Sequence, residues 1–221
     1  MAGERAARKK NLLQPTGNYV YSSNLISGLI MSARLLLEKA AIESTEHGGN
    51  NFLTEHGPAA IVIGVTALEA FVNQILFSCL RTLPNLQPQL EQLADRDNFL
   101  EKISDIPALV SGQQLRQYSD LALVQHVRNE IVHYYPKRGS PDTPAWLHPL
   151  NDKGLLYGIN GYPNDIGWED KMLSFYLAKW CGVTVAQAAE DFGLALGASN
   201  NLTAPGLSAK WTSGNFRALI I

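Results

Sequence analysis

The chain has 221 residues, of which 46% are hydrophobic, 17% are charged and 9% are aromatic, and its formal net charge is −2. A chain of this length and composition can bury a substantial core in one globular domain, which excludes disorder over most of its length. The near-neutral charge excludes a broad basic coat for nucleic acid. The low charged fraction is compatible with an interface buried between subunits.

The cysteines and the apolar stretches indicate where the protein resides. Cys79 and Cys181 are the only cysteines, and neither lies in a CxxC or metal-binding spacing. This usage is typical of a reduced interior. The basic first ten residues are not followed by an apolar run of signal-peptide length. Polar residues, Glu69 among them, interrupt the most apolar stretch, residues 59–80. We therefore expect a cytoplasmic protein without a membrane partner, in which 59–80 is a core helix.

Hydrophobic spacing predicts four long helices, at residues 19–43, 58–81, 119–135 and 168–192. On the first helix, one face carries apolar residues at helical intervals: Ile26, Ile30, Ala33, Leu37 and Ala40. On the last helix, the residues expected to point inward are Leu173, Leu177, Trp180, Val185, Ala188 and Phe192. The pattern predicts an all-α fold, an up-and-down bundle of four to five helices.

Proline and glycine divide the rest of the chain. Residues 84–119 favour only short helices, and residues 136–167 contain five prolines and five glycines, too many for a helix. We expect 136–167 to be a long irregular insertion with one short strand near 155–159. The predicted organisation is a flexible basic leader at 1–16, a single helical domain at 17–197 and a C-terminal tail at 198–221.

The third predicted helix ends in the sequence Arg-Asn-Glu-Ile-Val-His at residues 128–133. At about 100° per residue, Asn129 and His133 stack one turn apart, with His126 near the same line. Arg128 is offset from His133 by about 140°, but its long side chain can swing back toward the helix end. A guanidinium binds phosphate oxygens and an imidazole transfers protons near neutral pH, so this pair suits phosphodiester chemistry.

This hexapeptide resembles the signature of the HEPN superfamily (higher eukaryotes and prokaryotes nucleotide-binding), which comprises all-α domains. In that signature an Arg is followed by a polar residue, three further residues and a His, and Asn129 occupies the polar position. Tyr135 completes the extended Arg-x4-His-x-Tyr form of the toxin branch that is paired with nucleotidyltransferase antitoxins. The order of the helices over roughly residues 19–195 also resembles the family. The insertion and the C-terminal tail depart from the compact toxins.

The resemblance implies a metal-independent endoribonuclease that needs no cofactor and acts as a homodimer. The two motif helices would face each other across a composite cleft for RNA. His133 would be the general base on the ribose 2′-hydroxyl, and Arg128 would stabilise the charge on the scissile phosphate. The products would be a 2′,3′-cyclic phosphate and a 5′-hydroxyl. Asn129 would orient the pair or bind phosphate, and Tyr135 would contact RNA or be nucleotidylated. The implied setting is toxin–antitoxin or phage defence, with a nucleotidyltransferase-like antitoxin as a possible partner.

Other polar residues complete the predicted site. Glu69 lies with Thr66 and Asn73 in a polar stripe on the otherwise apolar second helix, and a buried carboxylate needs a partner. We therefore predict an ion pair between Glu69 and Arg128, a pair that a purely structural role would also explain.

Cationic and aromatic side chains offer contacts for RNA. Lys137 and Arg138 follow the motif helix directly and could guide an RNA backbone. Four tryptophans could stack bases, although packing is the default for the third: Trp146, Trp168, Trp180 and Trp211.

Two alternatives stay open. His126, Glu130 and His133 could form a three-ligand metal face, but a di-iron bundle needs a second Glu-x-x-His, which the chain lacks. The tetrapeptide Thr-Glu-His-Gly occurs at 45–48 and again at 54–57, and it is read more simply as helix capping than as metal chelation. A noncatalytic HEPN-like module that binds nucleotide, RNA or protein is the alternative to an enzyme.

Overall fold

The computed structural model describes residues 23–46, 54–96, 98–113, 115, 119–133, 144–157, 168–197 and 212–221. Its longer helices are α2 (Ser23–Glu46), α3 (Gly57–Thr82), α4 (Gln87–Ala94), α5 (Phe99–Ser111), α6 (Ser119–Val132) and α9 (Phe175–Gly197). Shorter elements are η1 (Pro84–Leu86), η2 (Ala145–Leu147), α7 (His148–Asp152), α8 (Trp168–Lys171) and η3 (Phe216–Leu219). The described residues contain no strand, so the all-α prediction is confirmed.

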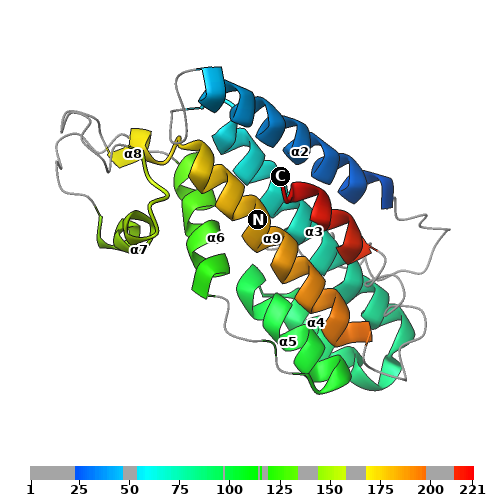
Figure 1. The fold of residues 1–221 in the computed structure, drawn as a ribbon. Helices are drawn as coiled ribbons and strands as arrows, with labels where there is room; N and C mark the ends of the chain where they lie inside the picture. Colours follow the sequence, from blue (N-terminus) through cyan, green and yellow to red (C-terminus); the bar gives the residue numbers. More distant parts are fainter. Residues whose placement is uncertain are drawn as a thin grey trace.

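Helix α3 lies at the centre of the fold and contacts α2, α5, α6 and α9 (Figure 1). Its sequence is apolar and long enough to cross a membrane, but 56% of its most apolar window is buried inside the protein. Burial of this kind is typical of a core helix that neighbours surround on several sides. The polar positions of α3 therefore need partners on those neighbours.

Helix α2 packs along α3 through the face that its sequence predicts. All five apolar residues of that face are at most 3% exposed, and they are Ile26, Ile30, Ala33, Leu37 and Ala40. Apolar burial of this kind stabilises by about 25 cal/mol per Å², so this face contributes much of the pairing of α2 with α3. The predicted end of the helix near residue 43 is extended to Glu46.

The second Thr-Glu-His-Gly copy lies at the start of α3, where its N-cap residue His56 makes no side-chain capping bond and the anion comes instead from Glu43 of α2. The Glu43 carboxylate at the end of α2 accepts the backbone N–H groups of Glu55 at 3.0 Å and His56 at 3.4 Å. The same carboxylate contacts the His56 ring, and Pro58 occupies the first turn of α3. Because unpaired N–H groups at a helix start favour a nearby anion, Glu43 stabilises this end of α3. His47 and Gly48 of the first copy lie outside the described residues.

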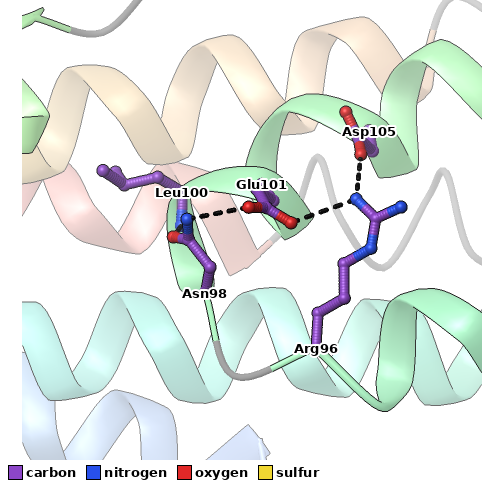
Figure 2. Close-up of polar contacts among 5 residues, drawn as sticks. All are labelled: Arg96, Asn98, Leu100, Glu101 and Asp105. Carbon is purple, nitrogen blue, oxygen red and sulfur yellow. Dashed lines mark hydrogen bonds and ion pairs between the residues drawn. The ribbon is translucent and has the colours of Figure 1, made fainter.

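Short helices fill residues 84–111, as predicted, and Figure 2 shows what starts the longest of them. Asn98 accepts the backbone N–H of Leu100 at 3.0 Å, and its own amide donates to Glu101 at 3.0 Å. Arg96 then donates to Glu101 at 3.1 Å and to Asp105 at 2.8 Å. An N-cap asparagine reinforced by a glutamate three residues later is typical of a helix start, so α5 begins at Phe99.

The predicted helix at 168–192 begins at Trp168 as expected, but it is interrupted and it extends past its predicted end. It divides into the single turn α8 and the long α9, which continues to Gly197. Ser174 causes the break, since its hydroxyl accepts the N–H of Leu177 at 3.0 Å and donates to the carbonyl of Leu155. Four of the six residues expected inward are buried, namely Leu177, Val185, Ala188 and Phe192. Leu173 and Trp180 are only partly buried.

The predicted C-terminal tail at 198–221 is also wrong for its last ten residues. Phe216 and Leu219 in η3 are fully buried, and the Phe216 ring lies 5.6 Å from that of Phe71 on α3. Gly182 on α9 lets this segment approach, because a Cβ there would lie 3.0 Å from the Leu219 carbonyl oxygen. The core of the domain therefore includes Phe216 and Leu219 near the end of the chain.

The insertion is partly ordered into helix where irregular chain was expected. Residues 144–157 form η2 and α7, anchored by the buried side chains of Leu147, Leu150 and Leu156. The expected strand near 155–159 does not form in its described part, where Tyr157 instead donates its N–H to the carbonyl of Lys171 at 2.9 Å. Helices α7 and α8 lie beside α6, on the side away from α2 (Figure 1).

Candidate functional site

Helix α6 positions the motif with one face in the core and one face outside. Leu121, Val124 and Val127 are at most 1% exposed, and they fix the rotation of the helix against α3 and α9. Arg128 lies one turn after Val124 and therefore shares the inner side. Asn129 and His133 lie on the outer side and are exposed. Helix α6 ends at Val132, earlier than the predicted Tyr135.

The predicted ion pair between Glu69 and Arg128 is present. Arg128 Nη2 lies 3.3 Å from Glu69 Oε2, and the two side chains are only 23% and 25% exposed. Arg128 Nη1 also donates to Asn129 Oδ1 at 2.8 Å. Arg128 Nε is buried and has no hydrogen-bond partner among the described residues. The guanidinium is thus held in place by two acceptors and keeps donor capacity that it does not use within the fold.

The other polar residues of the α3 stripe are also satisfied. Thr66 Oγ1 donates to the Val62 carbonyl one turn earlier, at 2.8 Å. Asn73 Oδ1 accepts from Lys102 Nζ on α5 at 3.2 Å. Lys102 is a second cation on this stripe and was not predicted. The polar character of Asn73 indicates that it needs a partner, but the sequence of residues 84–119 does not show which cation supplies it.

His133 is the first residue after α6 and projects from the opposite side of the helix to Arg128. Its backbone N–H continues the helical pattern by donating to the Asn129 carbonyl at 2.9 Å. Its ring makes no hydrogen bond or ion pair with the described part of the chain. The expectation that Arg128 swings back toward His133 is wrong, because the guanidinium turns inward to Glu69. Arg128 and His133 thus lie on different sides of one helix.

An aromatic cluster flanks the outer face of α6. The His126 ring lies 4.3 Å from the Trp146 ring of η2, centroid to centroid, and Trp146 meets Trp168 edge-on at 6.2 Å. His126 Nε2 is also 3.6 Å from the Glu130 carboxylate one turn later. No group of three or more His, Cys, Asp or Glu among the described residues could hold a metal ion. The arrangement of His126 and Glu130 is therefore an exposed pair beside a tryptophan.

The two cysteines lie in the core, away from this face. Burial raises the pKa of the Cys79 thiol to about 11, and burial also raises the pKa of Cys181 above its ordinary value. Both groups are free thiols and stay protonated near neutral pH. They supply neither a nucleophile nor a metal ligand to the motif.

Comparison of the chain with models of known families, with curated proteins and with solved structures gives no match. The motif and its geometry therefore carry the functional interpretation. Tyr135, Lys137, Arg138 and Trp211 lie outside the described residues, and their assigned contacts with RNA stay predictions. The described site consists of a clamped arginine, an exposed histidine and an aromatic flank.

Proposed function

We propose that the protein is a metal-independent endoribonuclease of the HEPN type that acts as a homodimer. The observation that carries the proposal is the ion pair between Glu69 and Arg128, 3.3 Å apart, on a helix that exposes His133. Burying an arginine and a carboxylate costs desolvation free energy, and apolar residues of similar volume would often pack at least as stably. Arg128 Nε is buried, but the two terminal nitrogens of Arg128 each carry a second N–H and the side chain is 23% exposed, so the guanidinium can also donate to an anionic partner such as a phosphate.

The separation of Arg128 from His133 within one chain favours a composite site. A two-fold axis passing near the edge of α6 where Arg128 reaches the exposed Asn129 would place the same surface of two copies together. Each half of the cleft would then combine Arg128 of one protomer with His133 of its partner. Asn129 is exposed and already bonded to Arg128, so it would orient the guanidinium at the edge of this cleft.

The chemistry of the proposed site needs only these side chains. Neutral His133 takes the proton from a ribose 2′-hydroxyl, and the 2′-oxygen attacks the adjacent phosphorus. The bond from phosphorus to the 5′-oxygen breaks, and the proton that His133 took from the 2′-hydroxyl is passed to the leaving oxygen, directly or through water. The products are a 2′,3′-cyclic phosphate and a 5′-hydroxyl. Arg128 stabilises the negative charge that develops on the phosphate oxygens, with its position fixed in advance by Glu69.

The test is RNA cleavage in the presence of EDTA. Wild-type protein is expected to cut a mixed RNA sample and to leave cyclic phosphate ends, while Arg128→Ala and His133→Ala are expected to lose the activity. His148→Ala is the matched control, because His148 is exposed on α7 and lies outside the motif. Cleavage that EDTA abolishes would contradict the metal-independent mechanism.

A second candidate function is a noncatalytic HEPN-like module that binds nucleotide, RNA or another protein. The inward rotation of Arg128 toward Glu69 favours it, since a purely structural ion pair would show the same geometry. Wild-type protein that binds RNA but never cuts it would support the module. For the endoribonuclease, and not for the module, we also propose a cytoplasmic role in toxin–antitoxin or phage defence with a nucleotidyltransferase-like antitoxin as partner.

A further inference from the structure

The cluster of His126, Trp146 and Trp168 is not used by the proposed chemistry, yet it borders the motif. Trp146 contacts His126 through its ring at 4.3 Å and Trp168 at 6.2 Å, and it remains partly exposed. Partial exposure is common for tryptophan, so the location of Trp146 rather than its exposure is what distinguishes it: part of its indole is open to solvent beside the motif helix. Its position at the surface beside polar groups suggests a contact with a ligand.

Trp146 belongs to η2, and the segment formed by η2 and α7 is attached to the rest of the domain. Leu147 and Leu150, which follow Trp146 in the chain, are completely buried. Farther along, Lys153 pairs with Asp120 at the start of α6 at 3.4 Å. The segment that follows Trp146 is thus fastened to the domain by its buried leucines and to the motif helix by Lys153, which limits the movement of the indole. A rigid aromatic surface loses little conformational entropy when a ligand stacks on it.

The distance from this cluster to the motif suits a single nucleic-acid strand. His126 and His133 lie seven residues apart on the same face of α6, which corresponds to about 10 Å along the helix. Stacked nucleotides advance by about 3.4 Å each along one strand, so the gap spans roughly three of them. A strand with its scissile phosphate at His133 therefore brings a base roughly three nucleotides away to Trp146.

We propose that Trp146, supported by His126, is a stacking site for a base of single-stranded RNA near the cleavage point. The inference rests on the proposed endoribonuclease and names how that site holds its substrate. The protein has a net charge of −2, so it lacks the broad basic surface that usually supplies affinity for RNA. Stacking on an aromatic ring supplies affinity that does not depend on charge and accepts any base.

Binding is measured with a fluorescently labelled ten-nucleotide RNA in which every 2′-hydroxyl is methylated, so that wild-type protein cannot cut it. We expect Trp146→Leu to weaken binding by about 5- to 150-fold, the range of one stacked base, and Trp146→Phe to restore most of the loss. Trp180→Leu is the matched control, because Trp180 is also partly buried but lies beside Lys153 at the other end of α6.

A second RNA, identical but without bases, separates stacking from folding. Wild-type protein is expected to bind it as weakly as Trp146→Leu binds the complete RNA, and the two changes together are expected to cost no more than either alone. Thermal unfolding of each variant shows whether the fold is retained. A Trp146→Leu variant that binds as tightly as wild type, or that loses the same factor on both RNAs, would overturn the stacking site.

Cleavage of unmodified RNA in EDTA, measured in parallel, distinguishes the two proposals. Cleavage without any dependence of binding on Trp146 overturns the stacking site alone. Binding that depends on Trp146 without cleavage overturns the endoribonuclease and supports the stacking site. Wild-type protein that binds neither RNA contradicts both.

Discussion

The exposed faces of α6 and α2 differ in almost every respect. The outer face of α6 is polar, with Asn129 and His133, and its one large exposed apolar residue is Val132 at 47%. The outer side of α2 carries four large exposed apolar residues, which are Leu25, Met31, Leu35 and Ile42. The two helices lie on opposite sides of α3 and α9 (Figure 1).

The surface best suited to protein association and the groups suited to catalysis therefore lie on different helices. Burial of apolar area is the main driving force of association, so α2 offers the better surface for a partner. The groups suited to phosphodiester chemistry lie on α6, and a contact through α2 would leave two copies of that face apart. The proposed composite site therefore requires that the polar face of α6 form the dimer, and the predictions below test this contrast from the largest effect to the smallest.

Loss of the motif side chains is expected to have the largest effect. His133→Ala should lower the rate of RNA cleavage by about 10²- to 10⁴-fold, the usual contribution of a general base. Because His133 is exposed, its removal should leave the free energy of unfolding unchanged. The measurements are single-turnover cleavage in EDTA and urea unfolding. An active His133→Ala variant would place the chemistry elsewhere.

The next largest effect is a loss of stability when an ion pair with an arginine is broken, either at Arg128 of α6 or at Arg34 of α2. Glu69→Ala should lower the free energy of unfolding by about 1 to 3 kcal/mol, because it leaves the largely buried Arg128 without its carboxylate. The matched control on α2 is Glu38→Ala, which breaks the exposed pair with Arg34, 2.8 Å apart, and should cost about 0.3 to 0.5 kcal/mol. Urea unfolding of both variants provides the comparison.

The rate of RNA cleavage distinguishes a catalytic role of the Glu69–Arg128 pair from a purely structural one. If Glu69 fixes the guanidinium for catalysis, Glu69→Gln should lower the cleavage rate by more than its effect on stability explains. Glu38→Ala should leave the rate unchanged. A Glu69→Gln variant with full activity would reduce the pair to a structural role.

The sequence predicts those parts of the molecule that depend on local pattern. Regular apolar spacing identifies the buried face of α2, and the isolated Glu69 in an apolar helix predicts its pairing with Arg128. Long-range contacts are not visible in such patterns. The helical spacing continues through Ser174, and the break there depends in part on a tertiary contact, the hydrogen bond that Ser174 donates to the Leu155 carbonyl. The last apolar residues show no period, which concealed the burial of Phe216.

The same limit applies to the candidate site. Periodicity places His126, Asn129 and His133 on one face of α6, as observed. It does not determine the direction of a long side chain: the sequence allows Arg128 to reach toward His133 or inward to Glu69, and the structure shows the inward direction. The pairing of Lys102 with Asn73 and the ring contact of Trp146 with His126 involve segments whose sequence predicts only short helices or an insertion.

Oligomeric state tests the contrast directly. We expect Val132→Asp on α6 to dissociate the proposed dimer, because it places a charge in the interface, and to abolish cleavage at the same concentration. Leu35→Asp on α2 is the matched control and should leave both properties unchanged, since Leu35 is 54% exposed. Sedimentation velocity measures the outcome. Dissociation by Leu35→Asp alone would show that copies pair through α2 and would exclude the composite site.

The smallest expected effect is a change in the pH dependence of stability caused by Cys79, a buried residue of the central helix α3. Burial raises the pKa of this thiol from its ordinary value of 9.0 to about 11, so the folded state binds its proton more tightly than the unfolded chain does. The stabilisation is present below pH 9 and is lost as the pH rises from about 9 toward 11. Cys79→Ala leaves a small cavity but should flatten the decline of the unfolding free energy over that range, which urea titrations at several pH values measure. An equal decline in both proteins would show that other groups cause it. Because the thiol lies far from either exposed face, cleavage by Cys79→Ala at pH 7 should match wild type, which separates the stability of the core from the chemistry of α6.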